Sequence, residues 1–223
     1  MAFDGIVTRA MVRELQDRIL LGKIEKVYQP EADELVFHIH TKNGNVKLLA
    51  SVGSAHARVC FITENPVNPP APLAFCMLLR KHLQGGRITE ITQKDSERII
   101  EISLETLNEL GFTMSKKLIF EIMGKHSNII FLSDENKIID SIKHISGMVS
   151  SVREVLPGRD YFIPGADQKQ DPLLHARKVK GAEIVKECLD RIDDRVIIAE
   201  DHQHHGAGNT RNYHCGRSHN TED

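Results

Sequence analysis

The sequence predicts an α+β fold in which an antiparallel β-sandwich is flanked by helices. Candidate strands are short, numerous and separated by turn residues, whereas candidate helices are few, a pattern typical of antiparallel sheets. Apolar residues make up 40% and charged residues 27% of the 223 residues, the balance of an ordinary globular protein. No apolar run approaches the roughly 20 residues of a membrane-spanning helix. We therefore expect a globular fold, not a disordered chain, a coiled-coil rod or an integral membrane protein.

The chain is predicted to begin with a helix. Apolar residues recur at helical spacing from Met11 to Leu20, Thr8 is a candidate N-cap, and Gly22 suits the end of the helix. Strands then follow, and Asn43-Gly44 strongly favours a tight hairpin turn between two of them. The strands expected in this half are residues 23–29, 35–40, 46–52 and 57–63.

A proline-rich stretch, residues 65–72, predicts a surface loop. Its last proline suits the first turn of a second helix, which Gly85-Gly86 would end. Arg80, Lys81 and His82 gather near the C-terminal end of that helix. Basic groups there suit the helix dipole, so helix capping and a phosphate-facing patch are both consistent with the pattern.

The remainder of the chain divides into a β-rich part and a different C-terminal part. Further strands are expected at residues 87–92, 98–104, 117–122, 128–132 and 138–142, followed by an irregular margin over residues 147–172. We expect one domain over residues 1–170, the start of a truncated helical region over 171–200, and a disordered tail over 201–223. The tail is rich in histidine and almost free of aliphatic residues, so it cannot bury enough apolar surface to order itself.

Neither catalytic motifs nor metal-ligand spacings stand out. The chain lacks GxSxG, HExxH, GxGxxG and phosphate-loop patterns, so we expect no enzyme activity and no cofactor. His38 and His40 share one strand face without an evident third ligand. The tail histidines 202, 204 and 205 have no supporting acidic residues, and a linker or tag-like extension accounts for them better than a metal site.

Composition also bears on location and partners. The four cysteines are scattered and form no CxxC pair, and the N-terminus lacks the pattern of a secretory signal, so a cytoplasmic protein is expected. The net charge is −2 and the chain has no tryptophan. Overall composition therefore does not favour nucleic-acid binding, and an anionic partner would have to meet a local basic patch.

Glu97 and Arg98 form one constellation of interest. In the expected strand, Arg98 begins the apolar face that continues with Ile100 and Ile102, while Glu97 points to the other face. A guanidinium at that position needs a partner or a cleft. The pattern leaves two interpretations open: a salt bridge to another element, or an arginine that contacts a nucleic-acid phosphate or base while Glu97 orients it.

A second constellation is the turn Lys125-His126-Ser127-Asn128, which follows Gly124. Glycine allows close backbone approach, and the polar side chains could hold a phosphate. Ordinary turn chemistry explains the same residues almost as well.

An ordered series of motifs resembles one known family. The matching residues are Phe3-Asp4-Gly5, Glu14-Leu15, Gln29-Pro30, Pro69-Pro70, Phe75 to Leu83, Gly86, Glu97-Arg98, Asn108-Glu109-Leu110-Gly111, Glu121 to Asn128, Ile139-Asp140 and Leu156-Pro157-Gly158. Over most of residues 1–165 the chain is similar to the N-terminal domain of the NFACT family, which includes RqcH-like ribosome quality-control factors and fibronectin-binding protein A-like proteins.

The resemblance implies a protein that binds tRNA on obstructed large ribosomal subunits holding peptidyl-tRNA. Such proteins recruit alanyl-tRNA and support untemplated alanine tailing of stalled chains. It implies tRNA binding by Glu97 and Arg98, where the family has an Asp-Arg pair, and weaker RNA phosphate contacts by Arg80, Lys81, Lys125 and His126. Rival expectations are a fibronectin- or fibrinogen-binding adhesion module and an inactive truncated remnant.

The resemblance also implies a fold similar to the N-terminal domain of formamidopyrimidine-DNA glycosylases. Those enzymes use an N-terminal Pro-Glu, whereas this chain begins Met1-Ala2-Phe3. We therefore expect the fold without glycosylase activity.

Overall fold

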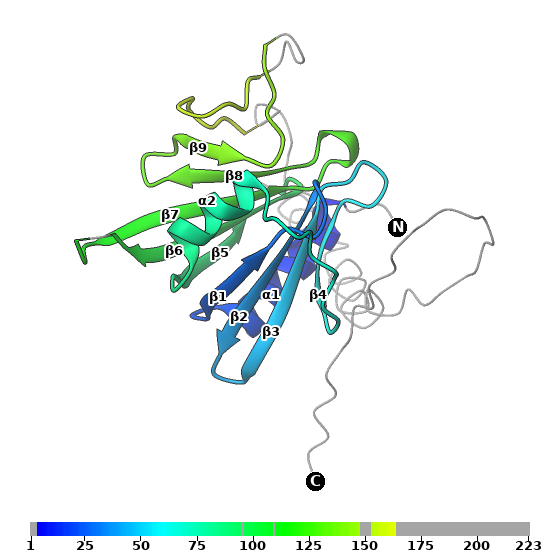
Figure 1. The fold of residues 1–223 in the computed structure, drawn as a ribbon. Helices are drawn as coiled ribbons and strands as arrows, with labels where there is room; N and C mark the ends of the chain where they lie inside the picture. Colours follow the sequence, from blue (N-terminus) through cyan, green and yellow to red (C-terminus); the bar gives the residue numbers. More distant parts are fainter. Residues whose placement is uncertain (1–3, 95, 109, 148–152, 164–223) are drawn as a thin grey trace, which may run out of the picture.

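The computed structural model describes residues 4–94, 96–108, 110–147 and 153–163. These residues form one nine-stranded antiparallel sheet and two α-helices (Figure 1). The elements in chain order are α1 (Gly5–Ile19), β1 (Lys23–Tyr28), β2 (Glu34–Thr41), β3 (Gly44–Ser51), β4 (Arg58–Ile62), α2 (Ala74–Leu83), β5 (Arg87–Gln93), β6 (Ile99–Leu107), β7 (Thr113–Glu121), the 3-10 turn η1 (Gly124–His126), β8 (Asn128–Ser133) and β9 (Ile138–Ser141). The strand order is β4-β3-β2-β1-β5-β6-β7-β8-β9.

The sheet folds over at the junction between β1 and β5. These strands share a single registered pair, Lys23 with Arg87, whereas the other neighbours pair over longer stretches. Phe37 of β2 and Phe120 of β7 lie four strand positions apart, which in a flat sheet would be ~19 Å. Their ring centroids are only 6.1 Å apart, edge to face. The half formed by β1–β4 therefore faces the half formed by β5–β9 (Figure 1).

The expected antiparallel sheet with helices beside it is thus confirmed, with one correction. The two layers are halves of one open sheet and not two separate sheets. The likeness to the glycosylase domain stays a prediction.

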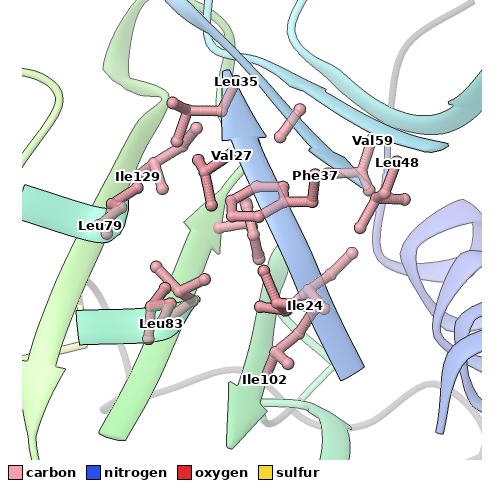
Figure 2. Close-up of a cluster of buried hydrophobic side chains, with 14 of the residues drawn as sticks. Ile24, Val27, Leu35, Phe37, Leu48, Val59, Leu79, Leu83, Ile102 and Ile129 are labelled. Atoms are coloured by element: carbon pink, nitrogen blue, oxygen red, sulfur yellow. The ribbon is translucent and has the colours of Figure 1, made fainter. Parts of the chain in front are cut away.

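The main apolar core fills the space between the two halves. Ile24, Phe37, Leu48 and Ile102 meet there from strands of both halves (Figure 2). The helices add one buried face each. These helical residues are Val12, Leu15 and Ile19 of α1 and Phe75, Cys76, Leu79 and Leu83 of α2.

Most expected elements occur within a few residues of their predicted bounds, but α1 begins earlier than expected. Asp4 is the N-cap, and its carboxylate accepts hydrogen bonds from the backbone N–H groups of Ile6 and Val7, both at 2.9 Å. Thr8 lies inside the helix, where its hydroxyl donates to the Asp4 carbonyl at 2.7 Å. The predicted N-cap was therefore wrong, because an aspartate four residues earlier caps the same helix.

The hairpin expected at Asn43-Gly44 is confirmed, but its two turn residues are Lys42 and Asn43, and Gly44 is already the first residue of β3. Thr41 pairs with Gly44 across the turn, and Gly44 has φ +112°, a conformation that favours glycine. No helix among the described residues is long and apolar enough to cross a membrane. The expected helical region at 171–200 and the tail at 201–223 lie outside the described residues, so the domain boundaries stay predictions.

Candidate nucleic-acid interface

Three segments that are distant in sequence meet at one end of the sheet. The backbone N–H of Ile122, just after β7, donates to the carbonyl of Arg98, just before β6, at 2.8 Å. The Gln93 side-chain amide donates to the carbonyls of Gly5 and Glu97 at 2.7 and 2.8 Å. The start of α1, the β5–β6 turn and the β7–β8 turn are therefore tied together.

The start of α1 rests directly on the β5–β6 turn. A Cβ atom added to Gly5 would lie 2.3 Å from the Ser96 carbonyl oxygen, closer than any side chain allows. From the next turn of the helix, Arg9 donates to the Ser96 hydroxyl at 3.0 Å and to the Gln93 side chain at 3.2 Å. Gly5 and Arg9 of α1 and the Glu97-Arg98 motif thus belong to one structural unit.

Glu97 and Arg98 lie in opposite environments, but the reverse of those expected: the sequence pattern placed Arg98 on the apolar face and Glu97 on the other face. Glu97 is buried, and its backbone N–H donates to the Lys94 carbonyl at 2.7 Å. Arg98 is exposed. In the described part of the chain, no ion pair to the Arg98 guanidinium is found, so the salt-bridge interpretation has no support there.

The expected strand position of Arg98 needs correction. β6 begins at Ile99, one residue later than predicted, and the core face starts with Ile100 and continues with Ile102 and Leu104. Arg98 therefore precedes the apolar face and does not begin it. Its guanidinium is free of the desolvation that the predicted position implied.

The polar residues of the β7–β8 turn fall into two groups, one buried and one exposed. Ser127 and Asn128 are buried. The Ser127 hydroxyl accepts from the Met123 N–H at 2.8 Å, and the Asn128 amide bonds both the N–H and the carbonyl of Lys143. Turn chemistry therefore explains these two residues. Lys125 and His126 remain exposed, at the end of the sheet that carries Arg98.

A buried ion pair that the sequence analysis did not single out supports this turn. Arg153 donates to both carboxylate oxygens of Glu121, one of them at 2.8 Å, and the Tyr161 hydroxyl donates to the same carboxylate at 2.8 Å. Burial and the charge of Glu121 raise the pKa of Tyr161. The sequence feature that could have predicted this ion pair is Glu121, the one carboxylate within the apolar run 118–122. A charged group at a core position requires a partner.

The structure does not bring Arg80 and Lys81 to the same place. Arg80 is half-buried; its Nε donates to the Val27 carbonyl at 2.7 Å and its guanidinium lies 5.4 Å from the centre of the Tyr28 ring. Arg80 thus fastens α2 to β1, while Lys81 is exposed on the same helix. Among the residues that the structure describes, no hydrogen bond or ion pair joins Arg80 to the turns that carry Arg98 and Lys125.

The described residues contain no group of three His, Cys, Asp or Glu side chains able to hold a metal ion. His40 is exposed and its Nδ1 lies 2.7 Å from the Asn45 side-chain oxygen. His38 is half-buried, with its ring centre 4.9 Å from that of Tyr28. The predicted solvated strand face is thus confirmed for His40 but not for His38.

Comparison with known proteins places this geometry in context. Residues 4–199 match the family described as NFACT N-terminal and middle domains. The chain is 46% identical over 175 residues to the Rqc2 homologue RqcH of Bacillus subtilis and 41% identical over 173 residues to that of Streptococcus suis. These matches cover 78% and 77% of the chain but only 30% and 31% of the relatives.

Solved structures agree with the sequence matches. The N-terminal part of the fibronectin/fibrinogen-binding protein of Streptococcus suis superposes with a TM-score of 0.73 and 38% identity, over 83% of this chain and 68% of that one. The N-terminal domain of the fibronectin-binding protein PavA of Streptococcus pneumoniae gives a TM-score of 0.71 and 31% identity, over 88% and 80%. The chain therefore belongs to the NFACT family and corresponds to its N-terminal part.

Proposed function

We propose that this chain is a non-catalytic tRNA-binding module of a cytoplasmic ribosome-associated quality-control factor. It would engage tRNA on obstructed large ribosomal subunits and support alanine tailing of the stalled chain, with peptidyl transfer left to the ribosome. One observation carries the proposal: strand pairing brings exposed Arg98 to the end of the sheet that also carries exposed Lys125 and His126. The 46% identity to an RqcH protein supports the same assignment.

The electrostatics of these residues suit a nucleic-acid backbone. A guanidinium that remains solvated loses little on meeting a phosphate and can form two parallel hydrogen bonds with it. Because the chain carries a net charge of −2, attraction must come from such local cations and not from the summed charge. Binding should therefore be specific to this end of the sheet and sensitive to salt.

Glu97 has a different part in the proposed site. Since its side chain is buried and its backbone N–H closes the turn onto Lys94, it would hold the turn that presents Arg98. Glutamate retains the charge of the family aspartate but moves the carboxylate outward by one methylene group. We expect Glu97→Asp to retain tRNA binding.

The decisive measurement is fluorescence-anisotropy titration of deacylated tRNA over a salt series. Arg98→Ala should weaken binding by about five- to tenfold and lower the salt slope by about one, as expected for one lost phosphate contact. Arg87→Ala is the matched control, because Arg87 is also exposed but is the first residue of β5 and pairs with Glu105, near the opposite end of β6 from Arg98.

The two variants must differ for the proposal to stand. Equal affinity of wild type, Arg98→Ala and Arg87→Ala would remove Arg98 from the tRNA site. Absence of tRNA binding by the wild-type chain would contradict a module that binds on its own and would favour the inactive-remnant alternative.

A second candidate function is binding of fibronectin or fibrinogen, since the structurally similar proteins of Streptococcus suis and Streptococcus pneumoniae are named fibronectin/fibrinogen-binding and fibronectin-binding proteins. The tip of the β6–β7 hairpin presents an apolar surface to a protein partner, since Leu107, Leu110 and Phe112 are 71%, 80% and 65% exposed. An apolar contact of this kind would resist added salt, whereas phosphate contacts weaken. Salt-resistant capture of fibronectin, lost in Phe112→Ser but not in Arg98→Ala, would favour this function.

A further inference from the structure

A pocket of about 230 Å³ lies on the face of β1 and β2 that points away from the main core. Its lining residues come from these two strands and from the loop after β4: Tyr28, Val36, His38, Asn65, Pro66 and Asn68. The pocket is smaller than the roughly 300–1,000 Å³ typical of sites for whole drug-sized ligands. It therefore suits a single compact ring system.

Two aromatic rings form one wall of this pocket. Tyr28 and His38 lie on neighbouring strands with their ring centroids 4.9 Å apart and their planes tilted by 58°. Val36, which pairs with Tyr28 and is buried, belongs to the same lining. Because the two rings are tilted, a planar ligand in the pocket would stack on one ring and meet the edge of the other.

Polar and cationic groups surround the aromatic wall. Asn65 and Asn68 are exposed in the loop, where their amides can both donate and accept hydrogen bonds. Lys26 and Lys47 are the direct strand neighbours of His38 on either side. Burial first, and then the charges of Lys47 and Lys26, lower the pKa of His38, so its imidazole is neutral at pH 7.

We propose that this pocket binds one unpaired nucleobase, whose phosphate meets the flanking lysines. Stacking on aromatic rings and hydrogen bonding by amides is how proteins recognise unstacked bases. Asparagine in particular can pair with the edge of adenine. If the base belongs to an RNA, the proposal rests on the proposed function, because the pocket would then be a second contact for the same RNA. A free nucleotide would offer the pocket the same ring and phosphate.

The test uses the full chain with two probes. Saturation-transfer NMR with AMP, GMP, CMP and UMP detects a free nucleotide, and anisotropy with deacylated tRNA detects RNA. The pocket variants are His38→Ala and Asn68→Ala; Asn68 is an exposed loop residue whose replacement leaves the core intact. His40→Ala is the matched control, because His40 lies two residues farther along the same strand face, is exposed and does not line the pocket.

We expect His38→Ala to weaken tRNA binding about tenfold and Asn68→Ala to weaken it less, with His40→Ala unchanged. Loss of nucleotide signals in the pocket variants, with tRNA affinity unchanged, would support the site and identify a free nucleotide as its ligand. If neither probe responds to either pocket variant, the proposal is overturned. Arg98→Ala distinguishes this proposal from the proposed function, because Arg98 lies outside the pocket. If tRNA binding is lost in Arg98→Ala but unchanged in the pocket variants, the proposed function is supported without the pocket.

Discussion

Three arginine side chains, those of Arg98, Arg80 and Arg153, lie in three different environments. Arg98 is exposed next to a turn, Arg80 is half-buried and bonds a backbone carbonyl, and Arg153 is paired with a fully buried carboxylate. The guanidinium of Arg98 is thus available to a ligand, whereas those of Arg80 and Arg153 are committed to the fold. Burial and partners, which residue type alone does not reveal, decide the role of each arginine.

Replacing Arg153 by alanine should strongly destabilise the protein. The change would leave the Glu121 carboxylate buried without its charged partner, which typically costs about 3–5 kcal/mol. The measurement is the free energy of unfolding in urea at pH 7. Arg159→Ala is the control, because the Arg159–Glu154 pair is largely exposed and such pairs contribute about 0–1 kcal/mol. Equal losses in the two variants would contradict a structural role for the Glu121–Arg153 pair.

The sequence singled out Glu97 and Arg98 by their alternation along the chain but not the Glu121–Arg153 pair. Alternation is a local property that neighbouring residues reveal. The partner of Glu121, in contrast, lies 32 residues away in a segment without regular structure. No local pattern indicates which of the many arginines would close that distance.

At the scale of elements, the start of α1 and the β5–β6 turn form one unit. The helix begins at Gly5 and meets the turn at Ser96, whose φ is +61°. Hydrogen bonds from Gln93 to both segments hold them together. The orientation of Arg98 therefore depends on a helix that lies some ninety residues earlier in the chain.

Gly5→Ala should weaken this unit. The added Cβ would lie 2.3 Å from the Ser96 carbonyl, so the helix or the turn must move, at a cost of about 1–3 kcal/mol. Thermal unfolding gives the stability, and tRNA titration should show weaker binding because Arg98 is displaced.

Ile6→Ala is the matched control for that change, because Ile6 occupies the next position of the helix and is partly exposed. It should lower stability far less and leave tRNA affinity unaltered. A Gly5→Ala protein with wild-type stability would argue against close packing of the helix on the turn.

At the scale of the whole molecule, the folded-over sheet makes the two halves interdependent. The Phe37–Phe120 contact joins strands that are four positions apart in the strand order. The Lys143 ammonium adds a second link by donating to the Val52 carbonyl, just after β3. The apolar faces of both halves are thus buried in the same core.

A double-mutant cycle on Phe37→Leu and Phe120→Leu tests this architecture. The two losses of unfolding free energy should be non-additive by about 0.5–1.5 kcal/mol, the range for edge-to-face aromatic pairs. Urea denaturation of wild type, both single variants and the double variant gives the coupling. Phe37→Leu combined with Ile138→Val should be additive, because Ile138 packs with Ile119 and Ile130 in a second apolar cluster that does not contain Phe37. Additivity in both cycles would contradict the packed contact between the halves.

The sequence by itself determined the antiparallel strands, the hairpin at Asn43-Gly44 and both helices. These features depend on periodicity, capping and turn chemistry, which act over a few residues. Only the tertiary structure decided that the sheet folds over, that Arg98 is exposed while Arg80 is committed to β1, and that His38 lines a pocket. Each of these depends on contacts between residues far apart in the chain, whose formation reflects the packing of the whole core and not any local preference.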